Sequence, residues 1–220
     1  MLAVLLFGPP GAGKGTQAAA VAAASGVPHI ATGDMFREHL RSGSELGRLA
    51  RANMDRGELV PDDVTIGMLE ARLDQPDAAR GFVLDGFPRT LDQASALDAL
   101  LARRGTRVSG VLDIEVHGEE LVRRLSGRMV CRDASHPYHV TDAPPAVPGI
   151  CDIDGSELYH RDDDHEDVIR NRVAVFEQET RPVREHYREL GTPIATIDGA
   201  RERAEVEADV IAAVLALEDT

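Results

Sequence analysis

The run Gly8-Pro-Pro-Gly-Ala-Gly-Lys14-Gly15-Thr16 carries the residue types that a protein needs to hold a phosphate group. Glycines let the backbone wrap an anion with its N–H groups facing inward, and a lysine adds a compact positive charge. The common phosphate loop has a serine or threonine directly after the lysine, whereas here Gly15 follows Lys14 and the hydroxyl belongs to Thr16. A turn that used glycine for geometry alone would leave Lys14 unexplained among apolar elements. The segment therefore predicts a nucleotide-phosphate site.

Such a loop binds an anion when a strand precedes it and a helix follows it. Residues 2–7 form a continuous apolar run typical of a strand buried on both faces, and an alanine-rich stretch to about Ala24 follows the loop. Strand and helix patterns then alternate, which predicts an α/β fold: a mainly parallel P-loop sheet flanked by helices on both faces. Further strands are expected at residues 28–30, 81–85, 108–116 and 193–197, and helices at 34–42, 44–56, 61–73, 90–103, 118–125, 165–190 and 201–217.

Two segments interrupt this alternation. Residues 31–60 give two successive helices without a strand, which predicts a helical insertion beside the sheet. Residues 127–164 are rich in proline, aspartate and histidine and predict a small separate lobe. The core is then expected from residues 1–30, 61–126 and 165–220, with Pro182 kinking or restarting the helix expected at 165–190.

Composition narrows the class of protein. The formal charge of −14 at pH 7 argues against a broad nucleic-acid-binding face, because phosphate backbones require a basic patch. No run of about eighteen apolar residues is present, and the start of the chain lacks the basic region of a signal peptide. Cys131 and Cys151 are too few for a secreted disulfide scaffold. We therefore expect a cytoplasmic protein with no nucleic-acid or membrane partner. We also expect a monomer, an expectation that does not rest on composition.

Five motifs, in order along nearly the whole chain, resemble those of the adenylate kinase family, in particular its long-lid nucleoside monophosphate kinases. The first is the Lys-Gly-Thr ending of the glycine-rich loop. The others are Thr32-Gly33-Asp34 with Arg37, Leu84-Asp85-Gly86-Phe87-Pro88-Arg89-Thr90 with Gln93, Arg124-Leu-Ser-Gly127-Arg128, and Arg161-Asp-Asp163-Asp164 with Arg172. The resemblance implies an enzyme of nucleotide biosynthesis that reversibly moves the γ-phosphoryl group of ATP to AMP, giving two ADP.

The resemblance also implies a role for individual residues. The residues expected to bind ATP are Gly11, Ala12, Gly13, Lys14, Gly15, Thr16, Arg124, Arg128, Pro137, Tyr138 and Arg201. Those expected to bind AMP, within the insertion and at the end of the strand at 81–85, are Thr32, Arg37, Glu58, Leu59, Val60, Gly86, Phe87, Pro88, Arg89, Gln93, Arg161 and Arg172. The expected catalytic residues are Lys14, Asp85, Arg89, Arg124, Arg128, Arg161 and Arg172.

This set of residues suits phosphoryl transfer, which leaves little covalent work for a protein and depends on alignment and on offsetting charge. Arginines bind phosphate oxygens in planar, bidentate geometry, and no histidine or cysteine motif suggests covalent catalysis. We expect direct in-line transfer, with Mg²⁺ held through nucleotide phosphates and through water on Asp85. The lobe at 127–164 would close as a lid to exclude water, with Gly127 and residues 162–164 as candidate hinges.

Two alternatives remain open on the sequence. A related kinase could act on UMP or CMP, or take GTP as donor, although the lid of roughly forty residues resembles the long-lid enzymes and not the short-lid pyrimidine kinases. The second alternative is a nucleotide switch or regulatory ATPase, which needs no acceptor site. That alternative leaves no common role for the residues expected at the acceptor, which are Thr32, Arg37, Arg89 and Gln93. His29 is interpreted as a polar residue at a strand edge.

No bound metal is expected in the lid itself. Many long-lid relatives hold a structural zinc there, and Cys131, Cys151 and Asp154 match three of the four ligand positions, but Ala134 stands at the remaining one. Structural zinc almost always has four protein ligands. Asp133 or His136 could substitute, although their spacing makes this awkward without a rebuilt turn. Hydrogen bonds and apolar packing are expected to hold the lid instead.

Overall fold

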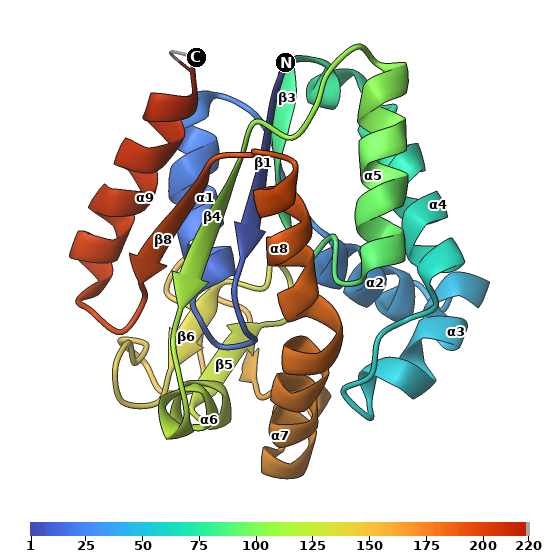
Figure 1. Ribbon diagram of the computed structural model, residues 1–220. Helices are drawn as coiled ribbons and strands as arrows, with labels where there is room; N and C mark the ends of the chain where they lie inside the picture. Colours follow the sequence, from blue (N-terminus) through green and yellow to red (C-terminus); the bar gives the residue numbers. More distant parts are fainter. Residues whose placement is uncertain (219–220) are drawn as a thin grey trace.

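The computed structural model describes residues 1–218, which form a five-stranded parallel sheet with helices on both faces and a second, smaller sheet (Figure 1). The order of the large sheet is β2-β3-β1-β4-β8. Its strands are β1 (Leu2–Phe7), β2 (His29–Ala31), β3 (Gly81–Asp85), β4 (Gly110–Glu115) and β8 (Ile194–Asp198). The expected α/β fold is confirmed, and each of the five expected strands is present within one or two residues of its predicted bounds.

The central strand β1 shows why its sequence is apolar throughout. Ala3, Leu5 and Phe7 point into one buried cluster, whereas Val4 and Leu6 point into the cluster on the opposite face. Successive side chains of a strand alternate between faces, so a strand covered on both sides must be apolar at every position. Packing on both faces therefore fixes the position of β1, and with it the start of the glycine-rich loop.

Two layers of helices cover this sheet. The first cluster packs β1 against α4 (Asp62–Leu73), α5 (Leu91–Arg103) and α8 (Arg181–Glu189), and the second packs it against α1 (Lys14–Ser25) and α9 (Arg203–Glu218). The helix expected at 165–190 is divided into α7 (Glu166–Val175), a π-helical turn (Phe176–Thr180) and α8. Pro182 lies in the first turn of α8, so the expected restart is confirmed.

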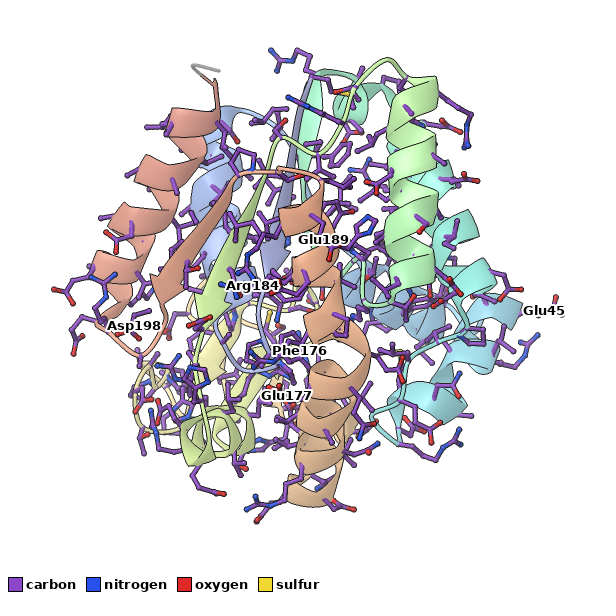
Figure 2. All side chains as sticks on the ribbon, viewed as in Figure 1. Glu45, Phe176, Glu177, Arg184, Glu189 and Asp198 are labelled. Atoms are coloured by element: carbon purple, nitrogen blue, oxygen red, sulfur yellow. The ribbon has the colours of Figure 1, made fainter. Side chains whose placement is uncertain are left out.

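The π-helical turn and α8 are held against the carboxyl end of the sheet by Phe176 and Arg184, which Figure 2 labels. Arg184 Nε lies 2.5 Å from Asp113 Oδ2 on β4, and its Nη2 lies 3.7 Å from Glu115 Oε1. The rings of Phe176 and Phe7 are 5.6 Å apart between centroids. These contacts fix the direction of the chain between α7 and β8.

Apart from the short 3₁₀ helix Pro76–Arg80, which leads into the amino end of β3, the remaining elements gather at the carboxyl ends of the strands (Figure 1). Residues 31–60 form α2 (Thr32–Arg41) and α3 (Glu45–Met54), which share a small apolar cluster of their own. After α6 (Glu119–Ser126), the strands β5 (Arg128–Cys131), β6 (Pro137–His139) and β7 (Leu158–Tyr159) form an antiparallel sheet in the order β6-β5-β7. Short 3₁₀ helices occupy Pro76–Arg80 and Asp162–Asp164. None of the helices in the described part of the chain is long and apolar enough to cross a membrane.

Candidate functional site

The glycine-rich loop joins β1 to α1 through backbone angles that other residues rarely adopt. Gly8, Gly11 and Gly13 have φ values of 135°, 87° and 94°, and Gly13 is the N-cap of α1. A Cβ at Gly8 would lie 2.3 Å from the carbonyl oxygen of Ile114 on the neighbouring strand. The loop can therefore wrap closely around an anion at the amino end of α1 only with glycine at these positions.

Lys14 turns back over this loop and is held in place by it. Its Nζ donates to the carbonyl oxygens of Gly8 at 2.7 Å and Pro9 at 2.9 Å. Burial lowers the pKa of Lys14 to about 8, an effect that Asp85 partly offsets and nearby arginines increase. The ammonium group is thus fixed in a partly desolvated position where a phosphate would stabilise its charged form.

The guanidinium groups of Arg89, Arg161 and Arg172 come from three different segments, and each lies close to other cations. Burial and neighbouring arginines lower the pKa of Arg89 to about 10 and that of Arg161 to about 9, and they lower the pKa of Arg172 as well. The Nε of Arg161 is buried and has no hydrogen-bond partner among residues 1–218. Crowded, desolvated cations repel one another, so an anion of high charge would relieve this repulsion. These arginines, with Lys14, Arg37 and Arg128, are called the cation cluster below.

Two aspartates organise this cluster, Asp163 and Asp164, which the sequence analysis placed in the motif at 161–164 and in a candidate hinge without a role of their own. The Asp164 carboxylate, whose side chain is 1% exposed, accepts from Arg128 Nε at 2.8 Å and Nη2 at 2.6 Å. It also accepts from Arg172 Nη1 at 3.1 Å, while Asp163 Oδ2 lies 2.9 Å from the same nitrogen. Asp163 and Asp164 therefore point inward and position two arginines, in addition to any part that residues 162–164 have as a hinge.

The end of β3 is packed against the start of α2. Thr32 Oγ1 donates to the carbonyl oxygen of Gly86 at 2.8 Å, and Arg89 Nε donates to the same oxygen at 2.7 Å. Gly86 has a φ of 76°, and a Cβ there would lie 2.7 Å from Arg89 Nη2. Glycine at this position is therefore required for Arg89 to fold over the strand end.

Asp62, at the start of α4, supports Gln93 and was missed by the sequence analysis. Gln93 Nε2 donates to Asp62 Oδ1 at 2.6 Å, and Thr90 Oγ1 donates to Asp62 Oδ2 at 2.6 Å. Gln93 Oε1 accepts from the backbone N–H of Arg89 at 2.8 Å. The amide of Gln93 is thus oriented by two neighbours, and its residue is only 2% exposed.

Asp85, at the carboxyl end of β3, faces Lys14 and His29. His29 Nε2 lies 3.7 Å from Asp85 Oδ2. Burial opposes ionisation of Asp85, yet His29, Lys14 and Arg89 hold its pKa below the usual value. Asp85 is therefore a carboxylate beside the loop, and His29, which was interpreted as a simple strand-edge residue, is its neighbour.

Several expected site residues take other positions. Arg124 Nε pairs with Glu120 at 2.7 Å on its own helix, Glu58 pairs with Arg56 at 2.6 Å, and Arg201 pairs with Asp209. Within residues 1–218, no hydrogen bond or ion pair joins these three to the cation cluster. Val60 and Phe87 are 7% and 2% exposed, and both pack in apolar clusters. Leu59 is partly buried and Pro137 is exposed, and Pro88 directly precedes Arg89.

The loop between β8 and α9 does lie against the glycine-rich loop. The N–H of Gly199 donates to the carbonyl oxygen of Glu115 at 2.9 Å, and a Cβ at Gly199 would lie 3.3 Å from the carbonyl oxygen of Ala12. The segment before Arg201 therefore borders the loop, although the Arg201 side chain turns to Asp209. Tyr138, also expected at ATP, uses its hydroxyl to accept from the N–H of Asp152 at 2.7 Å.

A glycine-rich loop between β1 and α1 of a parallel sheet, with a buried cation cluster at the carboxyl ends of the strands, defines a P-loop nucleotide-binding protein. The family model for adenylate kinase matches residues 6–192. An adenylate kinase of Streptomyces griseus is 49% identical over 98% of this chain and 99% of its own length. One of Methanothrix thermoacetophila is 52% identical over 90% of this chain and 92% of its own. The chain belongs to the adenylate kinase family.

Proposed function

We propose that this nucleoside monophosphate kinase transfers the γ-phosphoryl group of ATP to AMP, giving two ADP, by direct in-line displacement. The observation that carries the proposal is the cation cluster, which extends from Lys14 in the loop to Arg89 at the end of β3. A donor polyphosphate and an acceptor phosphate together supply the negative charge that such a cluster needs. Transfer requires both phosphates in line, with the charge of the moving group offset by these cations.

The loop would hold the donor. Gly11, Ala12, Gly13, Gly15 and Thr16 lie in the loop and first turn at the amino end of α1, where anions bind favourably. Their backbone N–H groups would bind the phosphates, although those of Ala12 and Thr16 donate here to the carbonyl oxygens of Pro9 and Gly13. Lys14 would leave its two carbonyl partners for the β and γ phosphates of ATP. Arg128, and Arg124 once released from Glu120, would contact the donor from the lid side, with Pro137, Tyr138 and the segment at Arg201 near its base.

The acceptor would lie between α2 and the end of β3. Arg89 and Arg37 would bind the AMP phosphate, with Arg161 and Arg172 between the two nucleotides. Thr32 and Gly86 are already joined by a hydrogen bond at 2.8 Å. Gln93, whose amide is held by Asp62 and by the N–H of Arg89, would contact the base. Glu58, Leu59, Val60, Phe87 and Pro88 would shape the pocket through backbone and packing.

The residues at the loop also fit a magnesium ion. Mg²⁺ keeps several waters and binds through few carboxylates and through substrate phosphates. Asp85 is a carboxylate beside Lys14, with its pKa held below the usual value, and it therefore suits a hydrogen bond to metal-bound water. When bound with the nucleotide, the ion would offset charge on the phosphates while Asp85 orients its water.

We divide the chain into a core of residues 1–30, 61–126 and 165–220, a monophosphate-binding insertion at 31–60 and a lid at 127–164. The insertion and lid meet in this structure: Arg41 Nη1 on α2 donates to the carbonyl oxygen of Asp133 at 3.1 Å. Closure of these two parts over the nucleotides would exclude water, the competing acceptor. We further propose that the protein acts as a monomer in the cytoplasm.

The reaction is tested by measuring ADP formed from ATP and Mg²⁺ with AMP, UMP, CMP or no acceptor. We expect rapid formation with AMP, far slower formation with the pyrimidine nucleotides, and almost none without an acceptor. Equal hydrolysis with and without AMP would refute the proposal, and GTP in place of ATP shows whether the donor site selects its base.

Arg89→Ala should weaken AMP binding about 10–100-fold, because a charge-assisted hydrogen bond contributes about 1.5–3 kcal/mol. ATP binding should change far less if Arg89 belongs to the acceptor side. Calorimetry with AMP and with a non-hydrolysable ATP analogue, each alone, measures the two effects. Equal losses for both nucleotides would instead place Arg89 between the phosphates.

Nucleotide binding should take up protons above about pH 8. Lys14 has a pKa of about 8 in the free protein, against an ordinary value of 10.5, and a bound polyphosphate would raise it again. Above pH 8 the bound state therefore holds more protons, and affinity should fall by up to about tenfold per pH unit. Calorimetry at pH 8.5–9 in buffers of different ionisation enthalpy measures this uptake, with pH 7 as control. An enthalpy independent of the buffer would contradict it.

A further inference from the structure

A chain of four hydrogen bonds links the start of α4 to the start of α5. The backbone N–H of Gln93 donates to Thr90 Oγ1 at 3.1 Å, and Thr90 Oγ1 donates in turn to Asp62 Oδ2 at 2.6 Å. From the other end, the backbone N–H of Arg89 donates to Gln93 Oε1 at 2.8 Å, and Gln93 Nε2 donates to Asp62 Oδ1 at 2.6 Å. A backbone N–H can only donate and an ionised carboxylate can only accept, so none of these bonds can reverse its direction.

The residues of this chain belong to rigid elements. Thr90 is the N-cap of α5, and Asp62 lies in the first turn of α4, where the helix dipole favours a carboxylate. Gln93 is only 2% exposed, so its amide cannot turn to water in exchange for a lost partner. The protein itself therefore sets the orientation of the Gln93 amide before any nucleotide binds.

Exchanging the oxygen and nitrogen of the Gln93 amide would break two hydrogen bonds. With the amide turned over, its oxygen would face the Asp62 carboxylate and its nitrogen would face the N–H of Arg89. Two acceptors would then oppose each other at one contact and two donors at the other. The bond to the carboxylate is the stronger of the two, because its acceptor is charged. Asp62 is therefore the group that contributes most to the orientation.

An amide held in this way presents a fixed pattern to a ligand. A primary amide has two N–H donors and two lone pairs on its oxygen, and the bonds to Asp62 and Arg89 use one of each. One N–H and one lone pair of Gln93 remain. The Watson–Crick edge of adenine complements them, with an acceptor at N1 and a donor at the 6-amino group. Hypoxanthine and guanine have the reverse pattern, a donor at N1 and an acceptor at the 6-oxygen.

We propose that Asp62 is a positioning residue that determines the choice of base, by fixing the Gln93 amide in the orientation that accepts a 6-aminopurine and opposes a 6-oxopurine. The inference rests on the proposed function, in which Gln93 contacts the base of AMP. A site with fixed donors and acceptors rejects the reverse pattern strongly, because buried polar groups are then left unpaired. Uracil has the reverse pattern and cytosine shares that of adenine, so Asp62 does not separate AMP from CMP.

The first test uses the unaltered protein, ATP and three monophosphates of similar shape. They are AMP, inosine monophosphate (IMP), whose base is hypoxanthine, and purine riboside monophosphate, which carries only hydrogen at C6. A fixed amide keeps one bond to purine riboside, through N1, and opposes IMP at both positions. We therefore expect kcat/KM to fall in the order AMP, purine riboside monophosphate, IMP. An amide free to turn would form two bonds with IMP, so a kcat/KM for IMP at or above that for purine riboside monophosphate would overturn the proposal.

The second test changes Asp62 itself. Asp62→Asn keeps the shape of the side chain, but its amide can donate as well as accept and so permits both orientations of Gln93. The ratio of kcat/KM for AMP to that for IMP should fall about tenfold or more, the scale of one hydrogen bond to a charged group. Asp63→Ala removes an exposed carboxylate from the same turn and should keep the ratio of the unaltered protein. An unchanged ratio in Asp62→Asn, or an equal fall in Asp63→Ala, would overturn the proposal.

The ratio separates base selection from a merely structural role of Asp62. A structural role would lower the use of AMP and IMP alike and leave the ratio unchanged, while thermal unfolding and the KM for ATP measure that role directly. Should Asp62→Asn fold poorly, the order of the three monophosphates in the unaltered protein still decides. Absence of ADP formation from AMP by the unaltered protein would refute the proposed reaction and this inference together. Normal use of AMP with an unchanged ratio in Asp62→Asn would refute the inference alone.

Discussion

Lys14→Met should keep the fold and lower the rate of ADP formation by about 100-fold or more. Lys14 is the only lysine among 24 basic residues, and its ammonium is fixed 2.7 Å from the carbonyl oxygen of Gly8. Loss of one preorganised electrostatic contact to a transferring group typically raises the barrier by about 3 kcal/mol. Steady-state rates at saturating ATP and AMP measure the effect, and thermal unfolding checks the fold.

The same substitution should not destabilise the free protein. Burial and nearby arginines both disfavour the charge on Lys14, so a methionine of similar length removes an unfavourable cation. Arg107→Met, an exposed cation before the amino end of β4, is the matched control and should leave both rate and Tm unchanged. A Lys14→Met enzyme of near-normal rate would show that Lys14 does not serve the transferring phosphate.

The layered fold could be predicted because its signals are local. Residues 2–7 are apolar at every position, and the structure explains this by burial of both faces of β1. Alanine-rich and amphipathic stretches predicted the helices, and Pro182 predicted that a helix restarts at α8. The strands of the small sheet were not predicted individually, because β6 and β7 have three and two residues and too short a pattern to recognise.

The candidate site was predictable only in part, since motifs identify residues that meet a ligand but not the residues that support them. Asp62 reaches Gln93 across 31 positions and Asp164 reaches Arg128 across 36, and no local pattern marks such pairs. The three consecutive aspartates at 162–164 could be recognised in the sequence, but nothing in their order shows that Asp164 points inward.

Asp164→Ala should lower the free energy of unfolding by about 3 kcal/mol, because breaking a buried ion pair leaves a charge without compensation. Here one carboxylate, with a side chain 1% exposed, serves both Arg128 and Arg172. The arginines are 22% and 19% exposed, so water can reach them in part and the lower end of the usual range of about 3–5 kcal/mol applies. For a chain of this size the loss corresponds to a fall in Tm of about 6–12 °C.

Two further variants test whether the loss of stability comes from the ion pairs of Asp164 or from removal of any carboxylate at 162–164. Asp162→Ala removes an exposed carboxylate two positions away and should change the Tm by less than about 1 °C, because surface substitutions of this kind have small effects. Asp164→Asn keeps an acceptor for the Arg128 guanidinium but loses the charge, so its Tm should lie between those of Asp164→Ala and the unaltered protein. Thermal unfolding of the three variants without nucleotide measures the order. Equal Tm values for Asp162→Ala and Asp164→Ala would mean that the two arginines do not depend on Asp164, and that their positions are fixed by packing alone.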